Sequence, residues 1–464
     1  MDNRIKSSEK LCGRNFTIAA IIKAPRYRKR EQVLIADLSE RDRFVLSIQS
    51  SFGILKFHSP NIGNISCLMV DDGIEHHIAL VADGKDMLFY LDGKFMYKKI
   101  INGGMMGTDN NLFIGIKYDD TNPYYGDINN VYVVNHSMSS DEIKELATEV
   151  KEPKPIITSK IPPAPLFEDP LYNSAKDGTV VWNPKYNEWW FVYMQIRNGN
   201  DEPEVAVHHG TTFGVATSPD CINWTYKGTL KGLDDYPGTN TWWAPEIIYV
   251  DGVFHGYFSF VEGRPWGWTG DRVIKHMISD DMFNWRFVND VVGMGSCRCL
   301  DCCVYPLPTG EWGMWYKDEI YNNTRFAKST DLCNFTHAGT IDSGVLPIEG
   351  CDIFEWKGYY WMLGDDLYSY NGLRVYRSED CENWTRFDNI LCKPGKRNMD
   401  ENVAHHPEII VDKKTDKAYV FYWTRGDACT LYGANENCYL QVAELEFENG
   451  KLLCNRDKEF ELDL

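Results

Sequence analysis

Two interleaved repeats run through the chain after residue 166, and their period constrains the fold more than any other feature of the sequence. The heptad Ser-x-Asp-x-x-Asn-(Trp/Phe) occurs four times, with its serines 61, 50 and 49 residues apart. A second pattern, an apolar strand followed by a polar turn and an aromatic strand, occurs five times. Its copies are Val180–Met194, Ile247–Phe260, Val304–Lys317, Ile353–Leu363 and Ile409–Trp423. Two β-patterns that alternate at about 50 residues predict a propeller of five blades.

The first 150 residues follow a different pattern, in which short strands alternate apolar and polar residues and turn residues separate several of them. The expected strands are Phe16–Ile22, Gln32–Leu38, Phe44–Ile48, His77–Ala82, Met87–Leu91 and Asn111–Ile116. This spacing predicts an antiparallel β-sandwich. Residues 151–165 hold five prolines, which is typical of a semi-rigid linker. We therefore predict an all-β chain with a sandwich at 1–150, a linker at 151–165 and a five-bladed propeller at 166–464.

Three segments of the sandwich resemble the laminin-G-like, concanavalin-type jelly roll over most of residues 14–149. They are the hairpin that ends in Tyr90-Leu91-Asp92-Gly93-Lys94, the turn Gly126-Asp127-Ile128 and the short helix Ser140–Ala147. Glu75 departs from the family, which usually has Trp before the paired histidines. The resemblance implies either an ancillary glycan-binding module or a structural partner of the propeller. We favour the second, because the linker is too short and stiff for a roaming module.

The charge balance excludes several classes of partner. Acidic residues outnumber basic ones by 67 to 48, a formal charge of −19, so we expect no binding to nucleic acid or to a membrane surface. No stretch approaches the roughly 18 apolar residues of a membrane span. The N-terminus lacks the pattern of a signal peptide, so we expect a cytoplasmic protein, with a removed leader left open. The sequence does not address the oligomeric state.

The 14 cysteines show no regular framework, which favours buried, reduced thiols. Four of them cluster at Cys297, Cys299, Cys302 and Cys303. Successive side chains of a strand point to opposite faces, and Cys302 and Cys303 follow Asp301 at a predicted strand start. These thiols could not all converge on one ion, so we predict no metal at the cluster.

Every predicted blade carries an acid or a histidine just before its first hairpin. These residues are Asp177, Glu246, Asp301, Glu349 with Asp352, and His406 with Glu408. The innermost strands of a propeller surround its axis, so polar residues at one register converge at one end. Buried carboxylates without partners are costly, and a set of them indicates a polar pocket rather than a packed core.

Residues 166–446 resemble the family-43 glycoside hydrolases, which are five-bladed propellers. The matching segments are Lys176-Asp177-Gly178, Trp243-Ala244-Pro245-Glu246, Leu300-Asp301, Glu349-Gly350 and His406 with the strand that follows it. The resemblance implies that Asp177 is the general base, that Glu349 is the general acid, and that Asp301 tunes and orients that acid. It places His406 near an axial water or metal, and calcium is the ion considered there. No cofactor is otherwise required. Gly178, Cys302 and Cys351 depart from the family pattern, which leaves the sugar undecided.

The chemistry of inverting hydrolysis requires the same three acids, Asp177, Glu349 and Asp301. One carboxylate activates water and a protonated carboxyl protonates the leaving oxygen, while a third acid keeps the donor protonated through like-charge repulsion. Aromatic residues make up 14% of the chain, and flat rings cover the apolar faces of sugars. The residues expected to bind substrate are Trp242, Trp243, Glu246, Trp266, Trp268, Tyr368 and His406.

The sequence therefore predicts a glycosidase that acts with inversion on an oligosaccharide, removing a terminal pentose or galactofuranose. Endo action stays open, as do the sugar and the linkage. A five-bladed enzyme similar to glycoside hydrolase family 117 is an alternative. A non-catalytic carbohydrate-binding propeller is another, although binding alone needs no acid and base.

Overall fold

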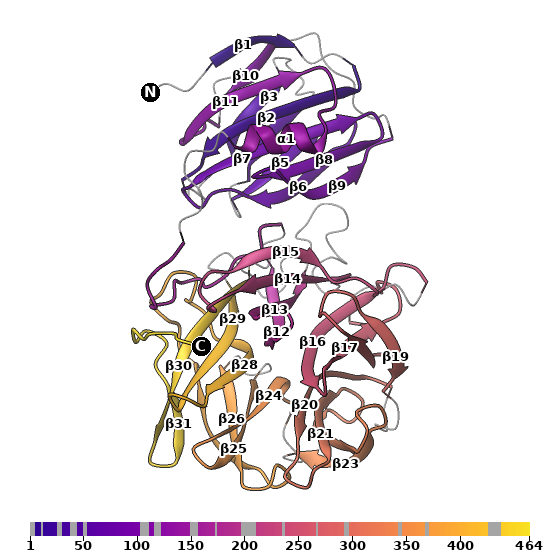
Figure 1. Cartoon of the computed structure of the whole chain (residues 1–464), viewed down its shortest axis with the longest axis vertical. Coiled ribbons are helices and arrows are strands. Elements are labelled where there is room, and N and C mark those ends of the chain that lie inside the picture. The colour runs from indigo at the N-terminus through magenta and orange to yellow at the C-terminus, as the bar shows by residue number, and fades with distance from the viewer. Residues whose placement is uncertain are drawn as a thin grey trace. The chain divides into compact units, whose positions relative to one another are not determined.

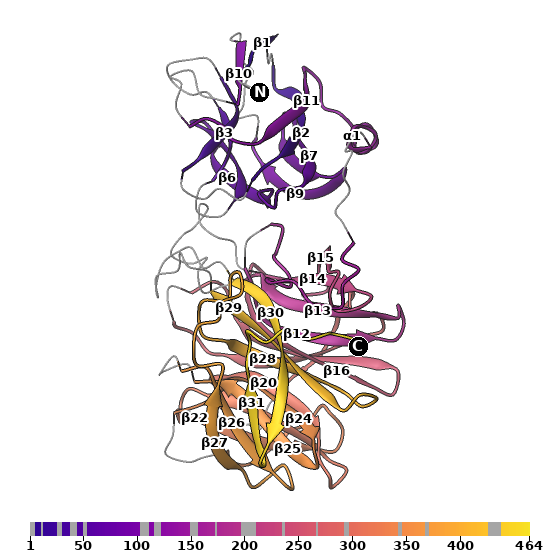
Figure 2. The same cartoon turned by 90° about the vertical axis from the view of Figure 1, so that its left-hand side faces the viewer.

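We describe the chain from a computed structural model. The structure describes residues 5–10, 13–25, 30–37, 44–49, 53–102, 111–115, 122–148, 156–171, 174–195, 210–233, 237–265, 268–291, 297–341, 346–366, 371–425 and 438–464. The chain divides into two compact units, Met1–Ile156 with Pro170–Tyr172, and Ile157–Asp169 with Asn173–Leu464. Figures 1 and 2 show both units.

The N-terminal unit is a sandwich of two antiparallel sheets, as predicted. One sheet has the order β1-β10-β3-β4-β5-β6, and the other has the order β11-β2-β7-β8-β9. The bounds of the first six strands are β1 (Ile5–Lys10), β2 (Asn15–Lys23), β3 (Gln32–Asp37), β4 (Val45–Ile48), β5 (Ile54–Ser59) and β6 (Gly63–Met69). The other five are β7 (Glu75–Asp83), β8 (Asp86–Leu91), β9 (Lys94–Ile100), β10 (Asn111–Ile114) and β11 (Asp127–Val134).

The helix α1 (Ser140–Ala147) covers part of one face of the second sheet. Its start is specified locally, because Ser139 and Glu142 form a reciprocal capping box. Ile143 is fully buried and packs against Ala19, Ala79 and other residues of β2, β7 and β8.

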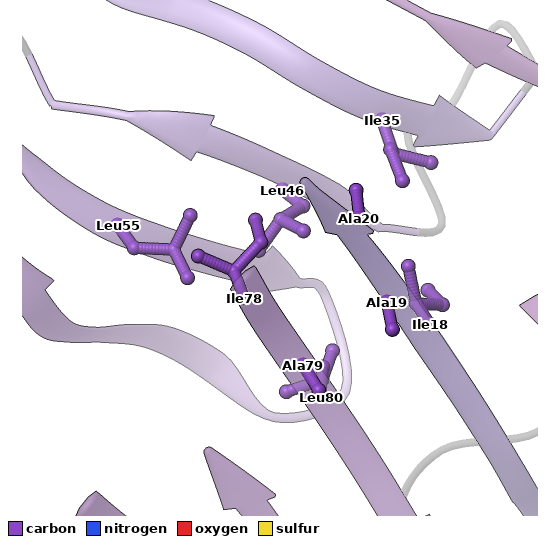
Figure 3. Close-up of a pocket in the computed structure, with 9 residues that line it drawn as sticks. All are labelled: Ile18, Ala19, Ala20, Ile35, Leu46, Leu55, Ile78, Ala79 and Leu80. Atoms are coloured by element: carbon purple, nitrogen blue, oxygen red, sulfur yellow. The ribbon is translucent and has the colours of Figure 1, made fainter. Parts of the chain in front are cut away.

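The space between the two sheets contains a small apolar gap, shown in Figure 3. It is too narrow for a water molecule. The residues around it are Ile18, Ala19, Ala20, Ile35, Leu46, Leu55, Ile78, Ala79 and Leu80. This lining offers no hydroxyl, amide or charge that could recognise a sugar, so the gap is a packing feature of the core.

The C-terminal unit consists of five four-stranded antiparallel sheets. The first three are β12 (Ala175–Asn183) to β15 (Thr225–Thr229), β16 (Thr241–Val250) to β19 (Arg286–Asp290), and β20 (Cys299–Pro306) to β23 (Thr336–Ile341). The last two are β24 (Glu349–Trp356) to β27 (Thr385–Ile390) and β28 (His405–Asp412) to β31 (Lys451–Cys454). The strands between these are β13 (Glu188–Gln195), β14 (Phe213–Ser218), β17 (Val253–Val261), β18 (Val273–Ser279), β21 (Trp312–Asp318), β22 (Asn323–Ser329), β25 (Tyr359–Asp365), β26 (Leu373–Ser378), β29 (Lys417–Arg425) and β30 (Cys438–Glu448).

The five sheets are the blades of a propeller, and the predicted fold class is confirmed. The first strand of each blade contacts the first strand of the next, and β28 contacts β12 to close the ring. Five apolar clusters fill the spaces between neighbouring blades. Cys302 packs between the second and third blades and Cys303 between the third and fourth, so the strand does point these two thiols to opposite faces.

The repeated heptad forms the turn between the third and fourth strands of the first four blades. In the first copy, Asp220 accepts hydrogen bonds from the backbone N–H groups of Ile222 and Asn223, at 2.9 and 2.8 Å. The Asn223 side chain donates to the other carboxylate oxygen, and the Trp224 indole N–H donates to the carbonyl of Cys221. The heptad therefore has a structural role, because each of its polar side chains forms hydrogen bonds that stabilise a tight turn.

The second half of the predicted linker belongs to the propeller. Asn223 exchanges two hydrogen bonds with the backbone of Ile157. Leu166 and Phe167 pack into the cluster between the fifth and first blades, together with Phe460 and Leu462 near the C-terminus. Both ends of the C-terminal unit thus help to close the ring of blades.

Candidate active site

The innermost strand of every blade carries a β-bulge at the same place. In each strand the pairing register shifts at a residue with positive φ: Asp177 (47°), Ala244 (41°), Asp301 (52°), Gly350 (55°) and His406 (45°). Bulges redirect side chains, and left-handed backbone at a residue other than glycine is strained, so such positions tend to mark functional sites. Three of the five are residues that the sequence singles out as candidates for catalysis or substrate binding.

The candidate acids lie at two levels along the axis, which corrects the expectation of a single register. Asp177, Asp301 and His406 occupy the bulge position, and Glu349 lies one residue before it. Two residues beyond the bulge are Thr179, Glu246, Cys303, Asp352 and Glu408, which we call the inner ring. Predicted substrate binding by Glu246 is not supported, because its carboxylate accepts the backbone N–H of Val304 at 2.8 Å in the next blade.

The inner ring links neighbouring blades through their backbones. Asp352 accepts the N–H of Ile409 at 2.6 Å, and Glu408 accepts hydrogen bonds from Thr179 and from the backbone of Val180. Although these acids keep some accessible surface, protein atoms surround their carboxyl groups. Burial raises the pKa of Glu246 to about 8 and that of Asp352 to about 7. Burial, together with the charges of Asp352 and Glu246, raises the pKa of Glu408.

A pH dependence of stability follows from the inner ring. A carboxyl whose pKa is raised by folding stabilises the fold below its unfolded pKa of about 4, and this contribution disappears as the pH rises through the folded value. Glu246→Gln keeps an acceptor for Val304 without a charge. As the pH rises from 5 to 9, we expect the free energy of unfolding of the variant to increase relative to that of the wild type by on the order of 1 kcal/mol. In thermal melts this amounts to a few degrees.

The matched control is Glu355→Gln, which replaces an exposed carboxylate on β24. The difference between its melting temperature and that of the wild type should stay constant across the same pH range. A Glu246→Gln variant whose difference from the wild type is the same at pH 5 and pH 9 would contradict this account of the ring.

Asp177 is held in place from the fifth blade. The Trp423 indole N–H donates to Asp177 Oδ1 at 2.8 Å, and His406 Nδ1 lies 3.6 Å from the same oxygen. Trp423 stacks on His405, with ring centroids 4.5 Å apart, and His405 Nδ1 lies 3.0 Å from Asp365 Oδ2. The Asp177 side chain is 23% exposed, so its free oxygen can reach a water molecule.

Asp301 and Glu349 form a hydrogen-bonded pair of carboxyls. The backbone N–H of Asp301 donates to Ser259 Oγ at 2.9 Å. Burial and the charge of Glu349 raise the pKa of Asp301 well above its usual range. Burial would also raise the pKa of Glu349, but the ammonium group of Lys317, 2.6 Å away, lowers it. These opposite directions favour a proton on Asp301 over one on Glu349.

Gly350 lets the fourth and fifth blades approach at this point. A Cβ on residue 350 would lie 2.2 Å from His406 Nδ1, which no side chain could tolerate, and its φ of 55° is left-handed. The absence of a side chain therefore allows the imidazole to lie beside the Asp301–Glu349 pair, where its charge also lowers the pKa of Glu349.

A cluster of cations and aromatic rings borders this pair. Glu319 Oε2 lies 3.0 Å from Arg272 Nε and 3.2 Å from Arg298 Nη2, while Glu319 Oε1 accepts the Trp268 indole N–H at 2.7 Å. Trp268 stacks on Trp243 with centroids 5.1 Å apart. Trp243 is buried, whereas Trp268 is 46% exposed and can present a ring face to a sugar.

The expected aromatic platform is therefore smaller than the sequence suggested. Trp242 is only 1% exposed and packs among Phe258 and Phe260 in the core between the first two blades, so it cannot stack on substrate. Trp266 and Tyr368 lie outside the described residues, and their proposed roles remain predictions.

Four supporting residues escaped the sequence analysis, and they share one position. Each is paired, on the second strand of its blade, with the residue just before the bulge: Ser259 with Trp243, Lys317 with Leu300, Asp365 with Glu349, and Trp423 with His405. Each contacts a bulge residue or Glu349. The signal was present in the sequence, because counting back across each predicted hairpin from the candidate acids leads to these positions.

The axial calcium ion that the sequence resemblance allows near His406 stays a prediction. Calcium takes six to eight oxygen ligands. Within the described residues no group of three or more His, Cys, Asp or Glu side chains is arranged to hold a metal ion.

Comparison with known proteins bears on both units. Residues 2–144 match the family model described as the Concanavalin A-like lectin/glucanases superfamily, and no curated protein matches. Among solved structures, a GH43 β-1,3-galactosidase is 16% identical, with a TM-score of 0.50 over 66% of this chain and 64% of that one. An exo-β-1,3-galactanase from Clostridium thermocellum is 14% identical, with a TM-score of 0.49 over 64% of each chain. At such identities the likeness establishes the propeller fold alone.

Within the described residues, no helix has the length and apolar character needed to cross a membrane.

Proposed function

We propose that this chain is a glycoside hydrolase that cleaves a terminal sugar from an oligosaccharide with inversion of configuration. The observation that carries the proposal is the presence, at or next to the bulges of the innermost strands, of one accessible carboxylate, Asp177, and one hydrogen-bonded pair of carboxyls, Asp301 and Glu349. A binding protein needs neither a carboxylate that activates water nor a carboxyl that protonates the leaving oxygen, whereas inverting hydrolysis needs both.

The residues take the following roles in this mechanism. Asp177 accepts a proton from a water molecule, whose oxygen attacks the anomeric carbon. Glu349 donates a proton to the leaving oxygen as the glycosidic bond breaks. Solvent then removes the proton from Asp177 and restores the one that the carboxyl pair has lost. Trp423 fixes the orientation of Asp177, and Trp268 offers a ring face beside the acid pair.

A panel of aryl glycosides tests the proposed activity directly. The panel should contain α-L-arabinofuranoside, β-D-xyloside and β-D-galactofuranoside, which the sequence leaves open. A β-D-galactopyranoside belongs in it because a structural neighbour is a β-1,3-galactosidase. Release of aryl alcohol from one member supports the proposal. Binding of sugar without turnover of any member would favour a non-catalytic propeller, and activity confined to other glycosides would favour an enzyme like those of family 117.

The stereochemical course provides a second test. Inversion requires room for a water molecule, so the carboxyl groups of Asp177 and Glu349 should lie roughly 6.5–9.5 Å apart. Proton NMR of a reaction with excess enzyme should show the inverted anomer first, followed by mutarotation. A first product of retained configuration would exclude this mechanism, because it needs a covalent intermediate.

A further inference from the structure

The Lys317 side chain is enclosed in the candidate active site and makes two ion pairs. It is 3% exposed, and its Nζ lies 2.6 Å from Glu349 Oε1 and 3.5 Å from Glu319 Oε1. The same ammonium group lies 5.8 Å from the centroid of the Trp268 ring. Lys317 is thus fixed between two carboxylates and touches the residue that should act as the acid.

The surroundings keep Lys317 in this position. Glu319 is itself held by Arg272, Arg298 and Trp268, so it cannot swing away with the lysine. The charged and titratable groups that face Lys317 and the carboxyl pair come from all the neighbouring elements. They are Asp177, Arg272, Arg298, Asp301, Glu319, Glu349 and His406.

We propose that Lys317 is a positioning residue that decides which carboxyl of the Asp301–Glu349 pair carries the catalytic proton. In the free site its ammonium group keeps Glu349 ionised, and the proton is stored on Asp301. When the leaving oxygen binds against Glu349, the proton passes along the hydrogen bond from Asp301 to Glu349 and on to that oxygen. Asp301 is then the proton reservoir of the site. This inference rests on the proposed function for its catalytic part, but proton placement can be observed without any substrate.

The balance of protons is complete in this scheme. The pair begins with one proton and ends with none, because the leaving oxygen takes it. The attacking water forms the new carbon–oxygen bond and gives its proton to Asp177. Solvent returns one proton to the pair and removes one from Asp177, so the site regains its starting state without a further reactant.

The kinetic test uses the pH profile of kcat/KM on a glycoside with a poor leaving group. The alkaline limb reports deprotonation of the carboxyl pair as a unit. Lys317→Met removes the ammonium group while keeping an unbranched side chain, and should move this limb about one pH unit or more to higher pH. Lys317→Arg keeps the charge and should restore the limb toward that of the wild type.

Glu319→Gln should move the same limb in the opposite direction. The anionic Glu319 raises the pKa of Asp301, so its removal makes the pair easier to deprotonate. This variant keeps Lys317 and tests the proposal even where Lys317→Met fails to fold. If the alkaline limbs of the wild type, Lys317→Met and Glu319→Gln coincide, the proposed role of Lys317 is wrong.

Carboxyl ¹³C NMR tests proton placement directly in the full chain. Asp301→Asn and Glu349→Gln assign the two resonances. Near neutral pH the wild type should show Asp301 protonated and Glu349 ionised, and in Lys317→Met the Glu349 resonance should move toward its protonated position. A protonated Glu349 in the wild type, unchanged by Lys317→Met, would overturn the proposal. Resonances that behave as expected in a protein that hydrolyses no glycoside would uphold the role of Lys317 and reject the proposed function.

Discussion

Asp177→Asn should abolish hydrolysis, lowering kcat by about 10²–10⁴-fold on activated and natural substrates alike. The amide cannot accept a proton from the attacking water, and no leaving group, however good, replaces that step in an inverting reaction. Asn is nearly isosteric with Asp and can still accept the Trp423 N–H, so the site should keep its geometry. The measurement is steady-state kinetics on two substrates that differ in leaving-group pKa.

Trp423→Phe is the matched control for Asp177→Asn. It removes the 2.8 Å hydrogen bond to Asp177 but leaves the carboxylate and most of the ring stack on His405. We expect a smaller loss, about tenfold, because the base is misaligned rather than absent. Unchanged melting temperatures would show that both variants are folded. Wild-type turnover by Asp177→Asn would show that the base lies elsewhere.

Glu349→Gln should separate substrates by their leaving groups. A sugar leaving group needs protonation as its bond breaks, so natural oligosaccharides should lose about 10²–10⁴-fold in kcat. A strongly acidic phenol leaves without a proton, and its glycoside should retain most of the wild-type rate. The ratio of the two losses measures the contribution of the acid.

Asp301→Asn extends this test to the other member of the pair. It keeps a hydrogen bond to Glu349 but removes the stored proton, so it should show the same leaving-group dependence as Glu349→Gln. Glu349→Gln losses that are equal on all leaving groups would contradict its role as the acid. A leaving-group effect in Glu349→Gln without one in Asp301→Asn would make Glu349 the sole store of the proton.

The architecture was readable in the sequence because it depends on local, repeated interactions. The Ser-x-Asp-x-x-Asn heptad closes each turn through contacts within a few residues, as Asp220 does with Ile222 and Asn223. Its period therefore reported the blades directly. The same phase marked Asp177 and Asp301 at equivalent positions and Glu349 one residue away, because equivalent positions of repeated strands must surround one axis.

The functional state of the acids depended on tertiary structure. A bulge divided the acids into two levels, and the inner ring came to link the blades rather than to bind substrate. Trp242 turned into the core while Trp243 lies under Trp268, because neighbouring residues of a strand face opposite sides. The ion pair of Lys317 with Glu349 joins the third blade to the fourth. A pKa depends on charges within a few ångströms in space, so the opposite pKa shifts of Asp301 and Glu349 arise only in the closed ring of blades.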